Sequence, residues 1–321
     1  MESTAIACTL TGCVGCVAGM ELIQRQVPNS AHLLTLVAFL FIVIEGGLSR
    51  SFTYEKRHIP FQAYIKIVLL FFAVNTCYNY AYDFDVSFPV AIVFKSSSLL
   101  ANVLLGFFLR RHVYSFRQLF SATVVSMGVI VFTLASWQPS SVPRSLPLLG
   151  SFPIPPFIIG VSLLFMAVFI SAYLGLLQED LYRTYGRHSR EAMFFVHFLS
   201  LPFFFLVAGD IVDAAVRASA TRPIVWPWPV AWLSSVPYMP DVPEAWGYIA
   251  GVTVLQWICV SYVSRLTSVT SSFNVTMVIT IRKYLSLFLS VYLFSNPFNV
   301  FHVIGSLFVL IGSLMFSGII G

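Results

Sequence analysis

Two adjacent cations interrupt a long apolar stretch in the last quarter of the chain. The stretch runs from Ser268 to Pro297 and sets Arg282 and Lys283 among about twenty otherwise uncharged residues, a length that spans a bilayer as a helix. A cation at membrane depth costs about 2.5–3.5 kcal/mol on insertion scales, so such residues normally face a water-filled cavity and meet an anion. The pair therefore predicts an anion-binding site inside a membrane.

One face of the same segment is polar. Its polar residues recur at spacings of three and four, which places them on one side of a helix: Thr276, Thr280, Lys283 and Ser286. We interpret this stripe as the wall of a polar cavity. Two alternatives stay open. Both cations could extend to an interface, or one could pair with an acid such as Glu21 or Glu45.

A third cation, Lys95, lies in another apolar stretch, with Ser98 and Asn102 on its face at helical spacing. Three cations together suit a multiply charged anion. A nucleoside diphosphate carries about two negative charges, and a nucleoside monophosphate nearly as many because its second pKa is about 6. Inorganic phosphate fits the charge as well, but the aromatic content of 16% suits stacking on a base or sugar. The aromatic candidates are Tyr78, Tyr80, Tyr82 and Tyr284.

Three other polar residues have a functional and a structural interpretation. Asp83 and Asp85 have the D-x-D spacing with which glycosyltransferases bind a metal and a sugar nucleotide, but a short acidic turn is the simpler interpretation. His197 either faces the cavity or bonds a neighbouring backbone carbonyl. The sequence contains no Ser-His-Asp set, metal-ligand cluster, Walker loop or dinucleotide fingerprint. It therefore predicts no bound metal, no cofactor and no ATP-driven pump.

Transmembrane helices must position these residues. Hydrophobic residues make up 58% of the 321-residue chain, charged residues only 10%, and the mean hydropathy is +0.86, which excludes an ordinary soluble protein. Because lipid offers no partners for backbone polar groups, we predict an all-α polytopic membrane protein. Its ten predicted transmembrane helices lie near 4–23, 32–49, 61–82, 86–109, 114–136, 155–177, 191–209, 246–264, 268–293 and 299–320.

The two halves of the chain show a weak internal sequence similarity. A shift of 184 residues places Gly128 on Gly312 and brings Lys95 within about one helical turn of Arg282. A unit of five helices puts its second copy upside down in the membrane, as in many transporters. We predict two inverted five-helix repeats, residues 1–136 and 155–321, joined by a lumenal linker at 137–154.

Loop charges predict the orientation. With both termini in the cytosol, cytosolic loops carry ten Lys and Arg residues and the opposite side four. The net charge of +5 is then a topology signal, so no nucleic-acid partner is expected. The loop 210–245 is predicted to be lumenal and interfacial because Trp226, Trp228 and Trp232 lie there among prolines.

All five cysteines lie in predicted helices: Cys8, Cys13, Cys16, Cys77 and Cys259. We interpret Cys13-Val-Gly-Cys16 as small-residue helix packing rather than a metal or redox site. The pattern predicts no disulfide framework.

Several motifs carry a family resemblance. They are Asn79-Tyr-Ala81, Phe94-Lys-Ser-Ser-Ser98, His188-Ser-Arg-Glu-Ala192, Thr280-Ile-Arg-Lys-Tyr-Leu-Ser286 and Asn296-Pro-Phe298. With these motifs the chain resembles the nucleotide-sugar transporters of the drug/metabolite transporter superfamily, and most of all the branch that carries UDP-N-acetylglucosamine and UDP-xylose. The resemblance covers nearly the whole chain. It implies ten helices, both ends in the cytosol, and exchange of a cytosolic nucleotide sugar for a lumenal nucleoside monophosphate.

The resemblance also implies residue roles. It places phosphate-binding cations at Lys95 and Lys283, with Arg282 beside them. Carriers of GDP-mannose have G-A-L-N-K and F-Y-N-N where this chain has Ile279-Thr-Ile-Arg-Lys283 and Phe194-Phe-Val-His197. These departures argue against a guanine nucleotide.

We therefore expect a bilayer-embedded antiporter, not an enzyme, in the Golgi or endoplasmic reticulum membrane. It would carry a UDP-sugar into the lumen in exchange for UMP, with UDP-N-acetylglucosamine first and UDP-xylose or UDP-glucuronate as further cargo; a homodimer is left open. The candidate substrate-binding residues are Lys95, Arg282, Lys283, Thr280, Thr276, Ser286, Ser98, Asn102, His197, Tyr80 and Glu21. The alternatives are a membrane glycosyltransferase with a UDP-sugar or lipid-linked donor, and a non-transporting membrane scaffold.

Overall fold

A computed structural model describes residues 2–48, 57–111, 113–137, 155–186, 188–223, 242–269 and 272–318. Within these ranges the regular secondary structure is entirely helical, and the single β-bridge, between Pro223 and Pro243, lies outside any strand. The predicted linker, beyond Trp137, lies outside the described residues, as do Trp226, Trp228 and Trp232.

The helices, in chain order, are α1 Glu2–Gln26, α2 Ala31–Leu48, α4 Phe61–Asp83, α5 Phe88–Ser96, α6 Ser98–Arg110, α7 Phe116–Ala135, α8 Pro156–Tyr185, α9 Ser189–Ser200, a 3-10 helix Leu201–Val207, α10 Ala208–Ser219, α11 Glu244–Val269, α12 Ser272–Phe294 and α13 Val300–Phe316. In the described part of the chain, nine segments are long and apolar enough to cross a membrane, and α13 is a shorter apolar helix. The prediction of an all-helical, polytopic membrane protein is confirmed at this level.

The seventh span differs from its prediction. We expected it to end at residue 209, but α9, the 3-10 helix and α10 continue it to Ser219. The reason is that α10 is amphipathic: Ile211, Ala214 and Ala218 are buried on one face, so the helix continues past its first acidic residue. The predicted loop 210–245 is shorter by these residues.

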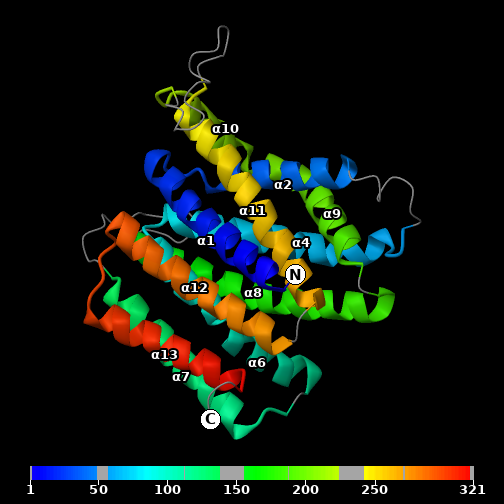
Figure 1. Cartoon of the computed structure of the whole chain (residues 1–321), viewed down its shortest axis with the longest axis vertical. Helices are drawn as coiled ribbons and strands as arrows, with labels where there is room; N and C mark the ends of the chain where they lie inside the picture. Colours follow the sequence, from blue (N-terminus) through cyan, green and yellow to red (C-terminus); the bar gives the residue numbers. More distant parts are fainter. Residues whose placement is uncertain are drawn as a thin grey trace, which may run out of the picture.

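Helices that are far apart in the sequence pack side by side. In Figure 1, α1 lies along α11, α7 along α13, and α4 crosses beside α8. Each pair joins one helix from the first half of the chain to one from the second half. The two halves therefore form one bundle.

Close backbone approach between α1 and α11 corrects the prediction for the cysteines. A Cβ at Gly12 would lie 2.8 Å from Ile258 Cγ2, and one at Gly19 would overlap Val252 Cγ2. At this approach Cys13 and Cys259, with Cα atoms 4.6 Å apart, form a disulfide. The prediction of no disulfide framework is wrong because the spacing of cysteines within one helix does not reveal which helix packs against it.

Different polar contacts hold the two ends of the bundle. At one end, here called the Arg25 end, Arg25 Nη2 donates to Asn296 Oδ1 at 2.8 Å and Arg217 donates to the Pro28 carbonyl at 3.0 Å. At the opposite end, here called the Arg110 end, Arg110 Nη2 donates to Asp180 Oδ1 at 2.7 Å. These contacts bring the ends of helices from both halves together.

The tightest packing between α7 and α13 occurs at two glycines. A Cβ at Gly128 would lie 2.6 Å from the Gly305 carbonyl oxygen, and one at Gly305 would lie 2.8 Å from the Gly128 carbonyl oxygen. Neither position has room for a side chain, because the obstructing atoms are backbone.

We therefore predict that Gly128→Val destabilises the bundle by at least about 1–3 kcal/mol, the usual range for overpacking. The matched control is Gly175→Val in α8, where a Cβ meets no atom within 4 Å. The measurement is thermal unfolding of purified protein in detergent, where Gly128→Val should melt at a lower temperature than both wild type and Gly175→Val. Equal melting of the two variants would contradict the packing described here.

Candidate anion-binding site

A break in the fourth span positions the first cation. The sequence predicted one continuous helix at 86–109, but α5 ends at Ser96 and α6 begins at Ser98. Ser97 Oγ donates to the Phe94 carbonyl at 2.6 Å, and Ser98 Oγ donates to the Lys95 carbonyl at 3.0 Å. Serine hydroxyls that bond nearby backbone carbonyls compete with regular helix. The break therefore lies directly after Lys95, and interrupted helices of this kind often form transporter sites.

The Lys95 side chain extends between helices. Its Nζ lies 4.7 Å from the centre of the Tyr78 ring on α4, a cation–π contact. From α12, Lys283 Nζ donates to the Lys95 carbonyl at 3.4 Å. Lys95 is nevertheless exposed, although it belongs to the candidate span Phe88–Arg110. Its exposed surface thus lies beside α4 and α12.

Arg282 completes a group of three like charges. Its Nη1 donates to Cys259 Sγ at 3.5 Å, so the guanidinium lies against the disulfide between α1 and α11. It is also within electrostatic range of both Lys95 and Lys283. Among the described residues, none of the three cations forms an ion pair with a carboxylate. The site therefore has a net positive charge that the described protein groups do not neutralise.

Neither alternative for the cation pair explains Lys283. Its Nζ donates to the Lys95 carbonyl, which lies inside the candidate span Phe88–Arg110, so it does not extend away from the bundle to an interface. Glu21 is buried and already has partners: Asn296 Nδ2 donates to it at 2.7 Å and Ser290 Oγ also donates to it. Since these partners and Arg25 lie at the Arg25 end, the proposed pairing of Glu21 with Lys283 or Arg282 is wrong.

The polar stripe on α12 faces the bundle as far as the structure describes it. Thr280 and Ser286 are 9% and 5% exposed. The side chain of Thr276 lies outside the described residues, although its backbone belongs to α12. Thr280 and Ser286 therefore remain candidates for the wall of the site.

Tyr80 and His197 have contacts elsewhere. Tyr80 Oη donates to Asp210 Oδ2 at 2.8 Å, which joins α4 to α10. His197 Nδ1 lies 2.6 Å from the Met193 carbonyl, and its ring packs edge-on against Phe39. His197 thus makes the backbone bond that we gave as its structural alternative, and neither residue contacts a cation within the described part of the chain.

The remaining candidates divide. Ser98 lies at the site through its bond to the Lys95 carbonyl. Asn102 is exposed one turn further along α6, where its carbonyl accepts the Tyr114 hydroxyl at 3.3 Å. Among the residues that the structure describes, Tyr78 is the one of the four aromatic candidates that makes a cation–π contact, and the sequence did not distinguish it from Tyr80.

The pair Asp83 and Asp85 forms the acidic turn that we favoured. Asp83 ends α4, and Asp85 has a left-handed backbone conformation with φ 59°. Beside this turn, at the Arg25 end, is a cavity of about 300 Å³, lined by Glu21, Gln24, Arg25, Asp85, Val86, Ser87, Phe88 and Asn296.

A bundle of candidate membrane spans that holds three cations without a carboxylate partner among the described residues suits a membrane transporter for anions. The sequence profile of the UAA transporter family matches residues 2–320, so the chain belongs to this family. The prediction of a nucleotide-sugar transporter rather than an enzyme is thereby confirmed, and the glycosyltransferase alternative is excluded.

Named relatives align over almost the whole chain. The UDP-xylose and UDP-N-acetylglucosamine transporter of Danio rerio is 34% identical over 98% of this chain and 93% of its own length. The endoplasmic reticulum GDP-fucose transporter of Drosophila melanogaster is 35% identical over 96% of this chain and 88% of its own length. The human nucleotide sugar transporter SLC35B4 is 34% identical, with 98% and 92% covered.

The unneutralised charges lead to a stability prediction. Lys95→Met and Lys283→Met remove charge but keep a long, flexible apolar side chain, so they remove repulsion without opening a large cavity. Without ligand, both variants should melt in detergent at or above the wild-type temperature. Asn296→Ala is the positive control, because it removes the amide that bonds buried Glu21 and should lower the melting temperature.

A fall in melting temperature for either lysine variant as large as that for Asn296→Ala would contradict this interpretation. It would mean that the lysine is half of a structural ion pair, since breaking such a pair costs about 3–5 kcal/mol.

Proposed function

We propose that this protein is an antiporter that carries a UDP-sugar from the cytosol into the lumen of the endoplasmic reticulum or Golgi and returns UMP. The observation that supports it most is the group of three cations, which has no carboxylate partner among the described residues. Both exchanged ligands carry about two negative charges, which suits this group. The Tyr78 ring beside Lys95 offers an aromatic surface near the same position.

The choice of uracil as the base is supported by one relative and by two segments that differ from the motifs of GDP-mannose carriers. The Danio rerio protein is named for UDP-xylose and UDP-N-acetylglucosamine. The Drosophila protein is named for GDP-fucose at similar identity, so overall identity does not select the base. The GDP-mannose motifs are absent at Ile279–Lys283 and Phe194–His197, which favours a UDP-sugar. We propose UDP-N-acetylglucosamine as the main cargo, with UDP-xylose and UDP-glucuronate as further cargo.

Helix starts support the proposal of ten spans in two inverted repeats. Ser115 caps α7 with a capping box that is closed by Gln118. Asn299 caps α13 with a capping box that is closed by His302. The shift of 184 residues that defines the repeat carries Ser115 onto Asn299 and Gln118 onto His302. The same N-terminal device thus occurs at corresponding positions of the two halves.

The contacts between α7 and α13 support the same proposal. Gly128 packs on Gly305 and Val309, and Gly312 packs on Ser121 and Val125. Under the shift of 184 residues, Ser121, Val125 and Gly128 correspond to Gly305, Val309 and Gly312. Each contact therefore has a reciprocal counterpart, which is the pattern that a two-fold axis generates.

The charge of the site supports exchange as the proposed mechanism. Lys95 belongs to the first half of the chain, and Arg282 and Lys283 belong to the second, so an anion between them touches both halves. In the empty site, closing the halves would bury like charges in a low dielectric at a cost of several kcal/mol, about the penalty for an uncompensated buried charge. A bound anion offsets this cost in either direction. Only the loaded carrier would then alternate readily between its two open states.

The test is uptake by proteoliposomes. Vesicles preloaded with UMP should take up labelled UDP-N-acetylglucosamine several-fold faster than vesicles loaded with buffer alone, with neither ATP nor a proton gradient. Unlabelled UDP-xylose and UDP-glucuronate should compete better than GDP-fucose and GDP-mannose.

Equal uptake by preloaded and empty vesicles would contradict exchange and indicate a uniporter. Stronger competition by GDP-fucose would contradict the choice of base but leave the exchange mechanism in place.

A further inference from the structure

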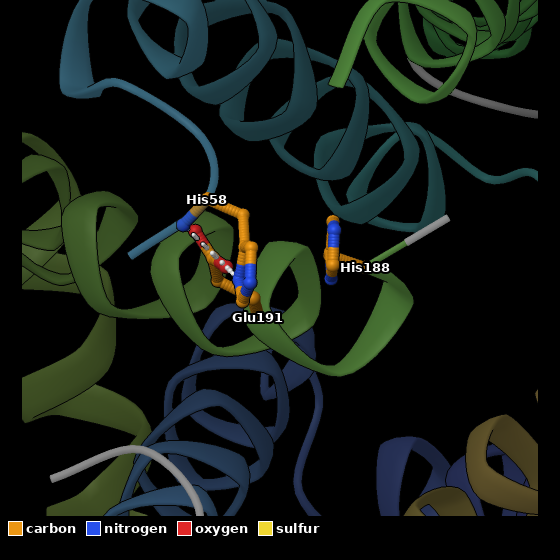
Figure 2. Close-up of side chains that lie close together, drawn as sticks. All are labelled: His58, His188 and Glu191. Atoms are coloured by element: carbon orange, nitrogen blue, oxygen red, sulfur yellow. Dashed lines mark hydrogen bonds and ion pairs between the residues drawn. The ribbon is translucent and has the colours of Figure 1, made fainter. Parts of the chain in front are cut away.

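Three metal-ligating side chains meet at the Arg110 end, apart from the group of three cations. They are His58, just before α4, His188, just before α9, and Glu191 in the first turn of α9. Their ligand atoms all lie within 4.8 Å of one another. Figure 2 shows the Glu191 carboxylate directed at His58, with the His188 ring standing beside the His58 ring.

Hydrogen bonds fix the Glu191 carboxylate in place. Its Oε1 accepts from the Ile59 N–H at 3.0 Å and from Tyr64 Oη at 3.4 Å, and its Oε2 accepts from the His58 N–H at 3.1 Å. The residue is 9% exposed. These bonds explain why a carboxylate is buried here, because it caps the backbone just before α4. They do not explain the His188 imidazole.

The His58 ring has a structural contact of its own, because its Nδ1 lies 3.3 Å from Glu191 Oε2. The His188 ring lacks such an explanation. The rings stack at 3.9 Å between centroids and 9° between planes. His188 does not cap α9 with its side chain, and its ring makes no hydrogen bond to a described residue. Two neutral imidazoles and one carboxylate are, however, a common ligand set for zinc, with the fourth position open to water.

The distances suit such a metal. With Zn–N bonds of about 2.0–2.1 Å and Zn–O bonds of about 2.0–2.2 Å, two ligand atoms at a tetrahedral angle lie about 3.3–3.5 Å apart. His58 Nδ1 and Glu191 Oε2 are already 3.3 Å apart. The His188 ring now stacks in parallel on the His58 ring, so its side chain must rotate out of this stack to direct a ring nitrogen at the same ion. The side chain of His58 is 46% exposed, so the site is open to an ion from solution.

We propose that His58, His188 and Glu191 bind a divalent transition metal, with Zn²⁺ the best match to this ligand set. The ion joins the segment before α4 to the start of α9, which are separated by 133 residues in the sequence. It therefore fastens the two halves of the chain at the Arg110 end. This proposal does not depend on which sugar is carried.

The experiment uses the purified full-length protein in detergent after removal of metal with a chelator. Zn²⁺ is titrated in the presence of a competing indicator, and Co²⁺ is added separately to record its visible absorption. The key variants are His188→Phe, which keeps a flat ring for stacking but has no ligand atom, and His188→Cys, which restores one. His58→Phe is a second loss variant, because the bond from the His58 backbone to Glu191 does not need the ring.

We expect wild type to bind one equivalent of Zn²⁺ more than His188→Phe and to melt at a higher temperature when Zn²⁺ is present. Both Phe variants should lose at least about 10–100-fold in affinity, the effect reported even for residues that only support a ligand. His188→Cys should recover most of the affinity. Without metal, His188→Phe should melt like wild type, whereas His58→Phe loses the contact of its Nδ1 with Glu191 and should melt slightly lower.

Two results would overturn the proposal. One is equal Zn²⁺ affinity in wild type and both Phe variants, which would place the metal on other residues. The other is no Zn²⁺-dependent stabilisation of wild type, which would leave the cluster as a helix cap alone.

Discussion

Positive charge held inside the bundle without a carboxylate partner among the described residues is the constraint on which the rest of the structure depends. Two unit charges 4 Å apart interact by about 4 kcal/mol at an effective dielectric constant of about 20, so three like charges must be held together by the surrounding fold. The break after Lys95 brings one cation to the site, and α12 brings Arg282 and Lys283. In the function proposed above, an anionic ligand supplies the charge that the described protein groups do not.

The buried carboxylates lie apart from the three cations. The carboxylates of Glu21 and Glu191 are 1% and 9% exposed and lie at opposite ends of the bundle, each bonded to several donors of its own. Neither reaches the cations of the central site. The polar contacts at the Arg25 end and those at the Arg110 end join helices from the two halves. A transporter that alternates between two open states must therefore break the contacts at one end while it keeps those at the other. The metal site proposed at His58 would strengthen the contacts at the Arg110 end.

Much of this could be predicted from sequence because hydropathy sets the spans and the scarcity of charge makes a cation in a span conspicuous. The predictions that failed were those that depend on distances between helices. The Cys13–Cys259 disulfide requires the close approach of α1 and α11, and the partners of Glu21 lie at a bundle end that spacing cannot locate. The three serines after Lys95 indicated the break at Ser97, but the high hydropathy of the whole segment led to the prediction of one continuous helix. The cluster of His58 with Glu191 needs the tertiary fold.

The most direct measurement compares the binding of uridine, UMP and UDP to wild type, Lys95→Met and Lys283→Met by calorimetry. If the cations bind phosphate, each substitution should weaken UDP binding by about 1.5–3 kcal/mol, the range for hydrogen bonds to charged groups, and leave uridine binding nearly unchanged. For each variant, the loss of UDP binding minus the loss of uridine binding isolates the contact between the cation and the phosphates. Equal losses for uridine and UDP, or no loss for UDP, would contradict the assignment of the three cations as the anion site.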